Sequence, residues 1–600
     1  MTRRTDRRPA AGRVLLAAVL LASVFPLRAA ASAPAAYRNV RIDLPARAGD
    51  LTCRAAAVFR RVAEEHAGRR LSGHAGRTLT IDLRLSEGQL PAEAFRIERN
   101  DDAVRITASD ENGLLYGLGR LLHASSFDAG RFVPGCCEGT SAPDKEFRGI
   151  YLATHFGNFY QAAPVAEVER YVEELALWGY NRLLVWFDRH SYEGIGDPAA
   201  QRMLQRLAAL LRAGRAMGMQ TGVTMLANEG YRTTPDSLKA RPIGFTDFYG
   251  VEICPSAPGG AELILRQSEE CLDAFCRLGC RIDQVVLWPY DQGGCACGDC
   301  AVWGGNGYLK IARRLCGMIR RKLPDAKITL STWLFDFREQ DKGEWRALAD
   351  AFDREGAWAD YVLADSHTDY PRYLLHHPVP GGLPLLNFPE ISMWGNFPWG
   401  GYGANPLPGR FQRLWDEASG RVAGGYPYSE GIFEDANKAM YSQFYWDGSR
   451  PARQTLRDYV RFEFSAEYAD RILEAIDILE RNYGGMSSYR WARSVDPDTP
   501  KTIDLPAKDH GAAKARRLLE EVDAKLPASV RRSWRWRLLV LRAYLDCELR
   551  RTGGAIDAGI DAAFREVMEI QHLENAHFYV RPPVDYGSAY PVEAVHGAAD

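Results

Sequence analysis

The sequence has almost no net charge, since 75 lysine and arginine residues nearly balance 77 aspartate and glutamate residues. Proteins that bind nucleic acid or an anionic membrane surface carry an excess of positive charge, so neither partner is expected. The sequence also has no short-period repeat and, apart from its N-terminal segment, no low-complexity tract. The 46% of hydrophobic residues over 600 positions predicts a globular protein of about two to four domains.

The longest N-terminal apolar run is too short to cross a bilayer. Residues 14–25 are apolar, follow an arginine-rich segment at residues 1–13 and lead into small residues at 29–33. A membrane-spanning helix needs about 20 apolar residues. The pattern is typical of a secretory signal peptide, which we predict over residues 1–33. The mature protein is therefore expected to be secreted or periplasmic, without further membrane contact.

Export makes the twelve cysteines informative, because outside the cytosol an even number of cysteines usually forms disulfides. Cys295, Cys297 and Cys300 are too close together to close a large loop, and three such thiols favour a tetrahedral sulfur site. Cys254, in a loop after the preceding expected strand, supplies the fourth ligand. We predict a structural zinc ion at these four residues, with one disulfide and a spare thiol as the alternative.

The chain divides into three expected domains by its hydrophobic pattern. Residues 36–140 predict a small α+β domain, with strands at 78–84, 95–99 and 103–108 and a helix at 112–123. Residues 433–600 predict a helical domain, with helices at 434–446, 453–462, 466–481, 512–526 and 533–551.

Between these domains, residues 145–432 alternate strand-like and helix-like segments eight times. The expected strands are 147–152, 181–187, 221–226, 284–288, 327–332, 361–364, 383–388 and 422–426. Eight such units in roughly 290 residues predict a (β/α)8 TIM barrel. An open doubly wound sheet is the alternative, but no glycine-rich dinucleotide-binding motif follows the first strand.

Acidic residues and histidines follow most of the expected strands. In a TIM barrel the catalytic groups lie at these carboxyl ends. Glycoside cleavage needs one protonated carboxyl group and one carboxylate, so we expect Asp291 as the acid and Glu390 as the base or nucleophile. Asp365 and Glu430 are expected as substitutes or substrate ligands. For any one of them, the alternative is a capping or salt-bridging carboxylate.

Aromatic side chains gather on the same loops, where flat rings suit the apolar faces of sugars. Trp178 and Trp186 lie inside elements and are expected in the core instead. The candidate substrate-binding residues are His155, Asp188, His190, Trp288, Trp333, His367, Trp394, Trp399 and Tyr428.

Two segments resemble known glycosidases. Residues 95–123, which form two expected strands and a Gly-Leu-Leu-Tyr-Gly-Leu helix, look like the domain preceding the barrel in β-N-acetylhexosaminidases and xylan α-glucuronidases. The run Phe147-Arg-Gly-Ile-Tyr151 is similar to the first barrel strand of the same enzymes. The resemblance implies a TIM-barrel glycoside hydrolase, and a helical region after the barrel is also similar to the α-glucuronidases.

The two families differ after the fourth strand. Hexosaminidases carry adjacent Asp and Glu there, whereas this sequence has Tyr290-Asp291. α-Glucuronidases use an acid after the fourth strand and two later carboxylates, and Asp291, Asp365 and Glu390 match that layout by strand. Asp stands where that family usually has Glu, and the cysteine-rich loop is foreign to it. The resemblance therefore implies a related but separate group, nearest in layout to the α-glucuronidases.

These observations together predict an exported glycoside hydrolase that acts on an oligosaccharide or glycoconjugate, with an acidic or N-acetylated sugar as the expected class. No cofactor is expected in catalysis. One alternative is a hexosaminidase-type or sialidase-type hydrolase, the latter with Tyr290 as nucleophile. Another is a non-catalytic glycan-binding protein. A metal-dependent hydrolase is disfavoured, because His155, Asp188, His190 and His367 form no compact metal-binding motif. The sequence leaves the oligomeric state open.

Overall fold

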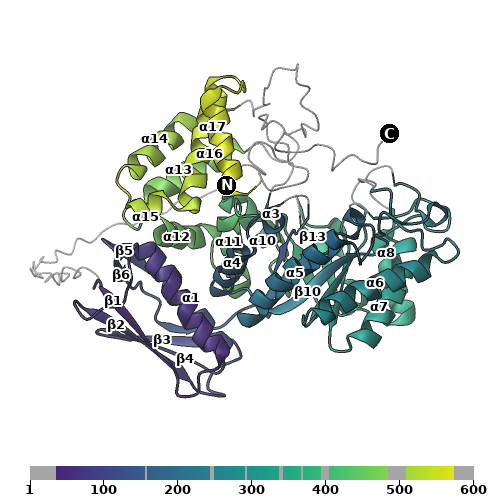
Figure 1. The fold of residues 1–600 in the computed structure, drawn as a ribbon, viewed down its shortest axis with the longest axis horizontal. Coiled ribbons are helices and arrows are strands. Elements are labelled where there is room, and N and C mark those ends of the chain that lie inside the picture. The colour runs from purple at the N-terminus through teal and green to yellow at the C-terminus, as the bar shows by residue number, and fades with distance from the viewer. Residues whose placement is uncertain are drawn as a thin grey trace, which may run out of the picture. The chain divides into compact units, whose positions relative to one another are not determined.

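A computed structural model describes residues 35–155, 158–243, 249–290, 293–336, 342–366, 369–392, 404–483 and 508–572 (Figure 1). The predicted signal peptide lies outside the described residues. Within these ranges, every helix is too short or too polar to pass through a membrane.

The N-terminal region, residues 36–141, is a mixed sheet covered by helices. Its main elements are β1 (Asn39–Asp43), α1 (Asp50–Ala67), β2 (Thr78–Leu85), β3 (Phe95–Asn100), β4 (Ala103–Ala108), α2 (Glu111–Ala124) and β7 (Gly139–Ser141). The strand order is β1-β2-β4-β3-β7, and β5 (Ser126–Asp128) pairs separately with β6 (Arg131–Val133). The strands and helix predicted from the sequence are all present.

Helix α2 explains the glycine-rich motif of this region. Asp110 caps the start of the helix, because its side chain accepts a hydrogen bond from the Gly113 backbone N–H. A Cβ atom at Gly119 would lie 1.9 Å from the carbonyl oxygen of Leu177. Glycine at this position therefore allows α2 to pack directly against the barrel.

The barrel, residues 147–446, has eight parallel strands and confirms the predicted (β/α)8 fold. The strands are β8 (Phe147–Leu152), β9 (Arg182–Trp186), β10 (Gln220–Leu226), β11 (Gln284–Trp288), β12 (Lys327–Ser331), β13 (Tyr361–Asp365), β14 (Leu385–Phe388) and an eighth strand in two parts, β15 (Gly424–Gly425) and β16 (Tyr428–Ser429). Both parts pair with β8 and close the barrel. Pro427, which has no N–H group, lies between the two parts.

Helices cover the outside of the barrel and aromatic residues fill its inside. The helices are α3 (Phe159–Ala162), α4 (Val165–Leu177), α5 (Pro198–Ala216), α6 (Gly260–Arg277), α7 (Gly307–Lys322), α8 (Glu344–Glu355), α9 (Arg372–His376), α10 (Pro408–Ala418) and α11 (Asp435–Trp446). Inside, Tyr151, Trp186, Trp288, Phe388 and Tyr426 belong to one buried cluster. Trp186 is thus a core residue, as predicted.

The helical region, residues 452–572, follows the barrel. It consists of α12 (Ala452–Glu463), α13 (Ala469–Asn482), α14 (Ala512–Asp523), α15 (Ala528–Arg531), α16 (Trp534–Arg551) and α17 (Ala558–Ile570). Four of these helices match predicted ones, while α15 and α17 were not predicted. The close contacts run from α13 to α14, from α14 to α16 and from α16 to α17, which makes a small bundle.

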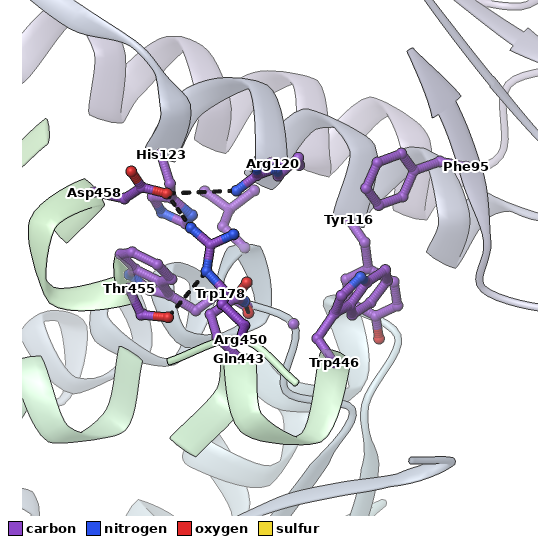
Figure 2. A pocket seen from close by; sticks show the side chains of 12 residues that line it. Phe95, Tyr116, Arg120, His123, Trp178, Gln443, Trp446, Arg450, Thr455 and Asp458 are labelled. Atoms are coloured by element: carbon purple, nitrogen blue, oxygen red, sulfur yellow. Dashed lines mark hydrogen bonds and ion pairs between the residues drawn. The ribbon is translucent and has the colours of Figure 1, made fainter. Parts of the chain in front are cut away.

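A pocket of about 410 Å³, open solvent included, lies where the three regions meet (Figure 2). Trp178 of the barrel stacks on His123 with ring centroids 3.6 Å apart. Arg450 forms an ion pair with Asp458, and Arg120 Nη1 lies 3.7 Å from the same carboxylate. Because these charges pair with one another, we interpret the pocket as the joint between the regions rather than as a catalytic site.

Candidate active site

Aromatic rings pack against one another at the carboxyl end of the barrel and form an aromatic surface that is partly exposed at Trp333 and Tyr428. Trp288 and Phe388, the last residues of β11 and β14, are buried and have ring centroids 4.8 Å apart. Trp333 lies 5.4 Å and Tyr428 5.5 Å from Phe388, measured in the same way. Trp288, Trp333 and Tyr428, which the sequence predicts as substrate-binding residues, therefore all surround Phe388. Partly exposed rings such as those of Trp333 and Tyr428 suit the apolar face of a sugar.

Tyr428 connects this surface to a carboxylate and a histidine. Its hydroxyl group donates a hydrogen bond to Glu430 Oε1 at 3.1 Å and lies 3.3 Å from His155 Nε2. Burial lowers the pKa of His155 well below its usual value, with a smaller contribution from His190. The predicted residues His155, Tyr428 and Glu430 thus form one hydrogen-bonded group.

Glu390 lies beside Tyr428, because the two residues form a parallel backbone bridge between the seventh and eighth strands. Its carboxylate accepts hydrogen bonds from the Ser392 backbone N–H at 2.8 Å and from the Ser392 hydroxyl group. Burial raises the pKa of Glu390 to about 8, although the Ser392 hydrogen bonds oppose that rise. At neutral pH most of this side chain is therefore a protonated carboxyl group.

A second carboxylate group lies after β10. Glu229 accepts hydrogen bonds from His190 Nδ1 at 2.8 Å and from Trp186 Nε1 at 3.2 Å. Arg189 Nε is 3.6 Å away, and the ring of His190 stacks on Tyr249 with centroids 3.5 Å apart. The sequence predicts His190 as a substrate-binding residue and places Glu229 at a strand end without assigning it a role. The sequence feature that points to a role for Glu229 is its position just beyond the end of the third predicted strand.

The ring of His155 connects the cluster around Tyr428 and Glu430 with the cluster around Glu229. Its centroid lies 4.6 Å from that of Trp186, whose indole donates to Glu229. Asp188, at the end of β9, accepts a hydrogen bond from Ser191 within its own loop at 2.8 Å. Burial raises the pKa of Asp188 to about 6. Predicted residues from the first, second and eighth strands are thereby brought together with Glu229.

The other predicted catalytic residues that the structure describes, Asp365 and Tyr290, lie in different surroundings. Asp365 ends β13 and pairs in register with Phe388, so its backbone adjoins the aromatic surface. Tyr290 donates a hydrogen bond to Glu344 of α8 and accepts one from the Gly304 N–H at 3.0 Å. Burial, followed by the charge of Glu344, raises the Tyr290 pKa. Four predicted residues lie outside the described ranges: Asp291, His367, Trp394 and Trp399.

The four predicted cysteine ligands converge. The Sγ atoms of Cys254, Cys295, Cys297 and Cys300 all lie within 4.8 Å of one another. Cys254 Sγ is 3.7 Å from Cys297 Sγ and 3.9 Å from Cys300 Sγ. Around a tetrahedral ion with metal–sulfur bonds of about 2.3 Å, neighbouring sulfurs are about 3.8 Å apart. The residues therefore fit a metal ion.

Asn228, buried at the end of β10, ties both cysteine loops to the barrel. Its side-chain amide donates to the carbonyl oxygens of Ile253 at 3.1 Å and Gly294 at 2.9 Å. Its side-chain oxygen accepts a hydrogen bond from the Gly294 N–H. Ile253 precedes Cys254 and Gly294 precedes Cys295. The cysteine cluster is thus held next to the carboxyl ends of β10 and β11.

The comparisons with known proteins agree with this fold. The model of glycosyl hydrolase family 20, domain 2, matches residues 25–136. The chain is similar to a family GH115 4-O-methyl-α-glucuronidase with specificity for decorated arabinogalactans, at a TM-score of 0.55 and 12% identity, over 90% of this chain and 77% of that chain. It is also similar to a GH138 enzyme targeting pectin rhamnogalacturonan II, at a TM-score of 0.52 and 12% identity, over 90% and 74% of the two chains. The sequence matches no curated protein.

These findings confirm the resemblance predicted from the sequence. The domain match falls on the α+β region that precedes the barrel, where the resemblance to hexosaminidases was found. The two structural likenesses extend over the barrel and both flanking regions, and at 12% identity they establish the fold.

Proposed function

We propose that the protein is an exported glycoside hydrolase with the three domains and the signal peptide predicted from its sequence. The observation that carries the proposal is that two buried glutamates both adjoin Tyr428, Glu390 through its backbone and Glu430 through its carboxylate. Burial raises the pKa of Glu390, and Glu430 accepts a hydrogen bond from the tyrosine. The Tyr428 ring belongs to the aromatic surface. Acid and base catalysis of glycoside cleavage uses two carboxyl groups in different protonation states.

The proposed roles follow from these environments. Glu390, protonated at neutral pH, is suited to protonate the leaving glycosidic oxygen, so it joins Asp291 as a candidate acid rather than serving as the base. Glu430 is the leading base or nucleophile, because its carboxylate follows the eighth strand and is oriented by the hydrogen bond from the Tyr428 hydroxyl. Asp365 remains the substitute. The carboxylate accepts a proton from water or attacks the anomeric carbon, and the separation of the two carboxyl groups decides which.

An acidic sugar is the substrate class that we propose to test first. The site contains His155 and His190, which offer ring N–H donors to a sugar carboxylate. Two of the similar structures, described above, are a 4-O-methyl-α-glucuronidase and an enzyme targeting a pectin. N-acetylated sugars are the second class, since the matched family domain belongs to glycosyl hydrolase family 20.

The test is hydrolysis of aryl glucuronides, N-acetylhexosaminides and sialosides by wild type, Glu390→Gln, Glu430→Gln and Asp291→Asn. We expect one class to be cleaved, with kcat reduced at least about a hundredfold in Glu430→Gln and in the variant that removes the acid. Glu64→Gln is the control, because that carboxylate accepts a hydrogen bond from Leu71 in the N-terminal region. If all classes stay intact while the same sugars bind, the protein is a glycan-binding protein instead.

We also propose that Cys254, Cys295, Cys297 and Cys300 hold a structural zinc ion. Four sulfur ligands fill a tetrahedral zinc site and leave no position for substrate, so the ion stabilises the loops after β10 and β11 rather than catalysing. When bound, it supplies a cross-link between two segments of chain.

Metal analysis tests the zinc site. We expect one zinc per chain in the wild type and in Cys271→Ser, a control thiol buried in α6. Cys297→Ser should lose most of the metal and unfold at lower temperature, because three ligands bind zinc less tightly. Cobalt substitution should add thiolate charge-transfer absorption to the wild type and to Cys271→Ser, and much less to Cys297→Ser. Two fewer titratable thiols in the denatured, metal-free protein would instead establish the disulfide alternative.

A further inference from the structure

The loop that carries Glu430 is held by a single buried carboxylate. Glu434 Oε1 accepts three hydrogen bonds, from the Ser429 hydroxyl at 2.7 Å, the Glu430 N–H at 2.7 Å and the Gly431 N–H at 2.9 Å. Glu434 is 2% exposed. Hydrogen bonds from two successive backbone N–H groups to one oxygen fix the direction of the chain between them. The direction of the Glu430 side chain therefore depends on Glu434.

A buried lysine holds the other side of the same loop. Lys438, one turn further along α11, donates from Nζ to the Gly431 carbonyl oxygen and to the Tyr171 hydroxyl, the latter at 2.8 Å. Its Nζ lies 3.9 Å from Glu434 Oε1. A buried ammonium group is stable only with such partners. Glu434 thus accepts a hydrogen bond from the Gly431 N–H, and Lys438 donates one to the Gly431 carbonyl oxygen.

The helical region reaches this pair through Asp435. The Asp435 carboxylate accepts hydrogen bonds from Tyr171 at 2.5 Å, from Tyr459 of α12 at 2.7 Å and from Arg535 Nε of α16 at 2.6 Å. Burial opposes the charged form, but Arg535 and Lys438 outweigh burial and keep the pKa of Asp435 below its usual value. Tyr171 is shared with Lys438, so Arg535 and the Glu430 loop belong to one buried network.

Helix α17 also contacts this loop. Gln571, the residue that ends α17, accepts a hydrogen bond from the Ile432 N–H at 3.4 Å. A Cβ atom on Gly431 would lie 2.0 Å from Gln571 Nε2. Two separate parts of the helical region therefore reach residues 429–432, Gln571 directly and Arg535 by way of Asp435.

We propose that Glu434 is a positioning residue for Glu430, and that the helical region completes the active site by fixing this loop through Asp435 and Gln571. The inference rests on the proposed function, in which Glu430 is the base or nucleophile. It assigns to the helical region a part in catalysis beyond stability, because a displacement of about 1 Å at a catalytic carboxylate can cost about a hundredfold in rate.

The experiment compares two buried glutamates that differ in their contact with the loop. Glu434→Gln weakens the acceptor for the three hydrogen bonds. Glu173→Gln is the matched control, because the buried Glu173 pairs with Arg54 at 2.7 Å and with Arg61 at 3.1 Å, away from the loop. On the aryl glycoside that the wild type cleaves fastest, we expect Glu434→Gln to lower kcat at least tenfold with KM changed less than threefold. Glu173→Gln should lower the thermal midpoint and leave kcat within twofold.

A pair of substitutions tests the contact with α17. Gln571→Ala removes the acceptor of the Ile432 N–H and should lower kcat with KM changed less than threefold. Gln571→Glu keeps that acceptor and should retain kcat, a rescue by the conservative variant that a purely structural role would not give. If Glu434→Gln does not fold, Ser429→Ala removes one of the three donors and takes its place.

The outcomes separate the inference from the function on which it rests. Wild-type kcat in Glu430→Gln would remove Glu430 from catalysis, and the proposed role of that residue fails. Loss of activity in Glu430→Gln, together with wild-type kcat in Glu434→Gln or in its Ser429→Ala replacement, overturns the positioning role alone. Equal kcat losses in Glu434→Gln and Glu173→Gln also overturn it, since general destabilisation then accounts for both.

Discussion

At the scale of residues, the environment of each carboxylate decides its chemistry. Glu390 and Glu430 follow adjacent strands and contact neighbouring groups, yet one is a buried carboxyl next to a serine and the other accepts a hydrogen bond from Tyr428. Their identical side chains therefore have different surroundings, from which the different roles proposed for them follow. The same reasoning applies to Glu229, whose carboxylate forms an ion pair with Arg189 and accepts a hydrogen bond from His190.

Glu390 predicts a particular dependence on pH. If it is the acid, kcat/KM should be maintained at neutral pH and fall as the pH rises through about 8, where the carboxyl group loses its proton. In Glu390→Gln this descending limb should disappear or move, and the residual rate should depend less on pH. A profile with an unchanged alkaline limb in Glu390→Gln would assign that limb to another group.

The same pKa has a consequence for stability. Because the pKa of Glu390 is higher in the folded chain than in the unfolded chain, its protonated form contributes stability that is fully present below pH about 4.5. That contribution is lost as the pH rises toward about 8. The free energy of unfolding of wild type minus that of Glu390→Gln should therefore decrease over this interval, as measured by urea titration.

At the scale of elements, the closure of the barrel depends on a close backbone approach. Gly424 of β15 has a φ of +139°, and a Cβ atom there would lie 1.7 Å from the Phe147 carbonyl oxygen of β8. The eighth strand is short and divided at Pro427, so few ladder hydrogen bonds replace those lost if β15 moves away. Glycine at this position is therefore a requirement of closure.

Gly424→Ala should lower the free energy of unfolding by about 2–4 kcal/mol, because it adds a clash to an unfavourable φ. Gly356→Ala is the matched control: Gly356 has a φ of +75° but a Cβ there meets nothing within 4 Å. We expect the control to lose about 1 kcal/mol. Equal losses in urea unfolding of the two variants would show that the approach to Phe147 is unimportant.

At the scale of the whole molecule, buried ion pairs connect regions that are distant in sequence. Arg148 of β8, fully buried, donates to Glu93 of the N-terminal region at 2.8 Å. Arg535 of α16 donates to Asp435 of α11, which lies 100 residues earlier. Removing one member of such a pair leaves an uncompensated buried charge. The three regions are therefore joined by specific contacts, and the pocket in Figure 2 lies at one such joint.

The sequence alone determined the order and type of most elements. Periods of two and of 3.6 residues report which face of a strand or helix is buried, and that property is local. Eight alternating units therefore predicted the barrel, and the spacing of three cysteines predicted a cluster that the structure brings together with Cys254. The division of the eighth strand was not predicted, because it depends on how closely Gly424 approaches β8.

Only the tertiary structure decided which predicted site residues meet and in what state. His155, Glu390, Tyr428 and Glu430 come from both ends of the barrel sequence, and their contacts exist only after β14, β16 and β8 close the sheet. The raised pKa of Glu390 results from burial, which the residues beside it in the sequence do not specify. The link from Arg535 to the Glu430 loop likewise depends on the packing of distant helices. Local patterns encode elements, whereas protonation and positioning are properties of the assembled chain.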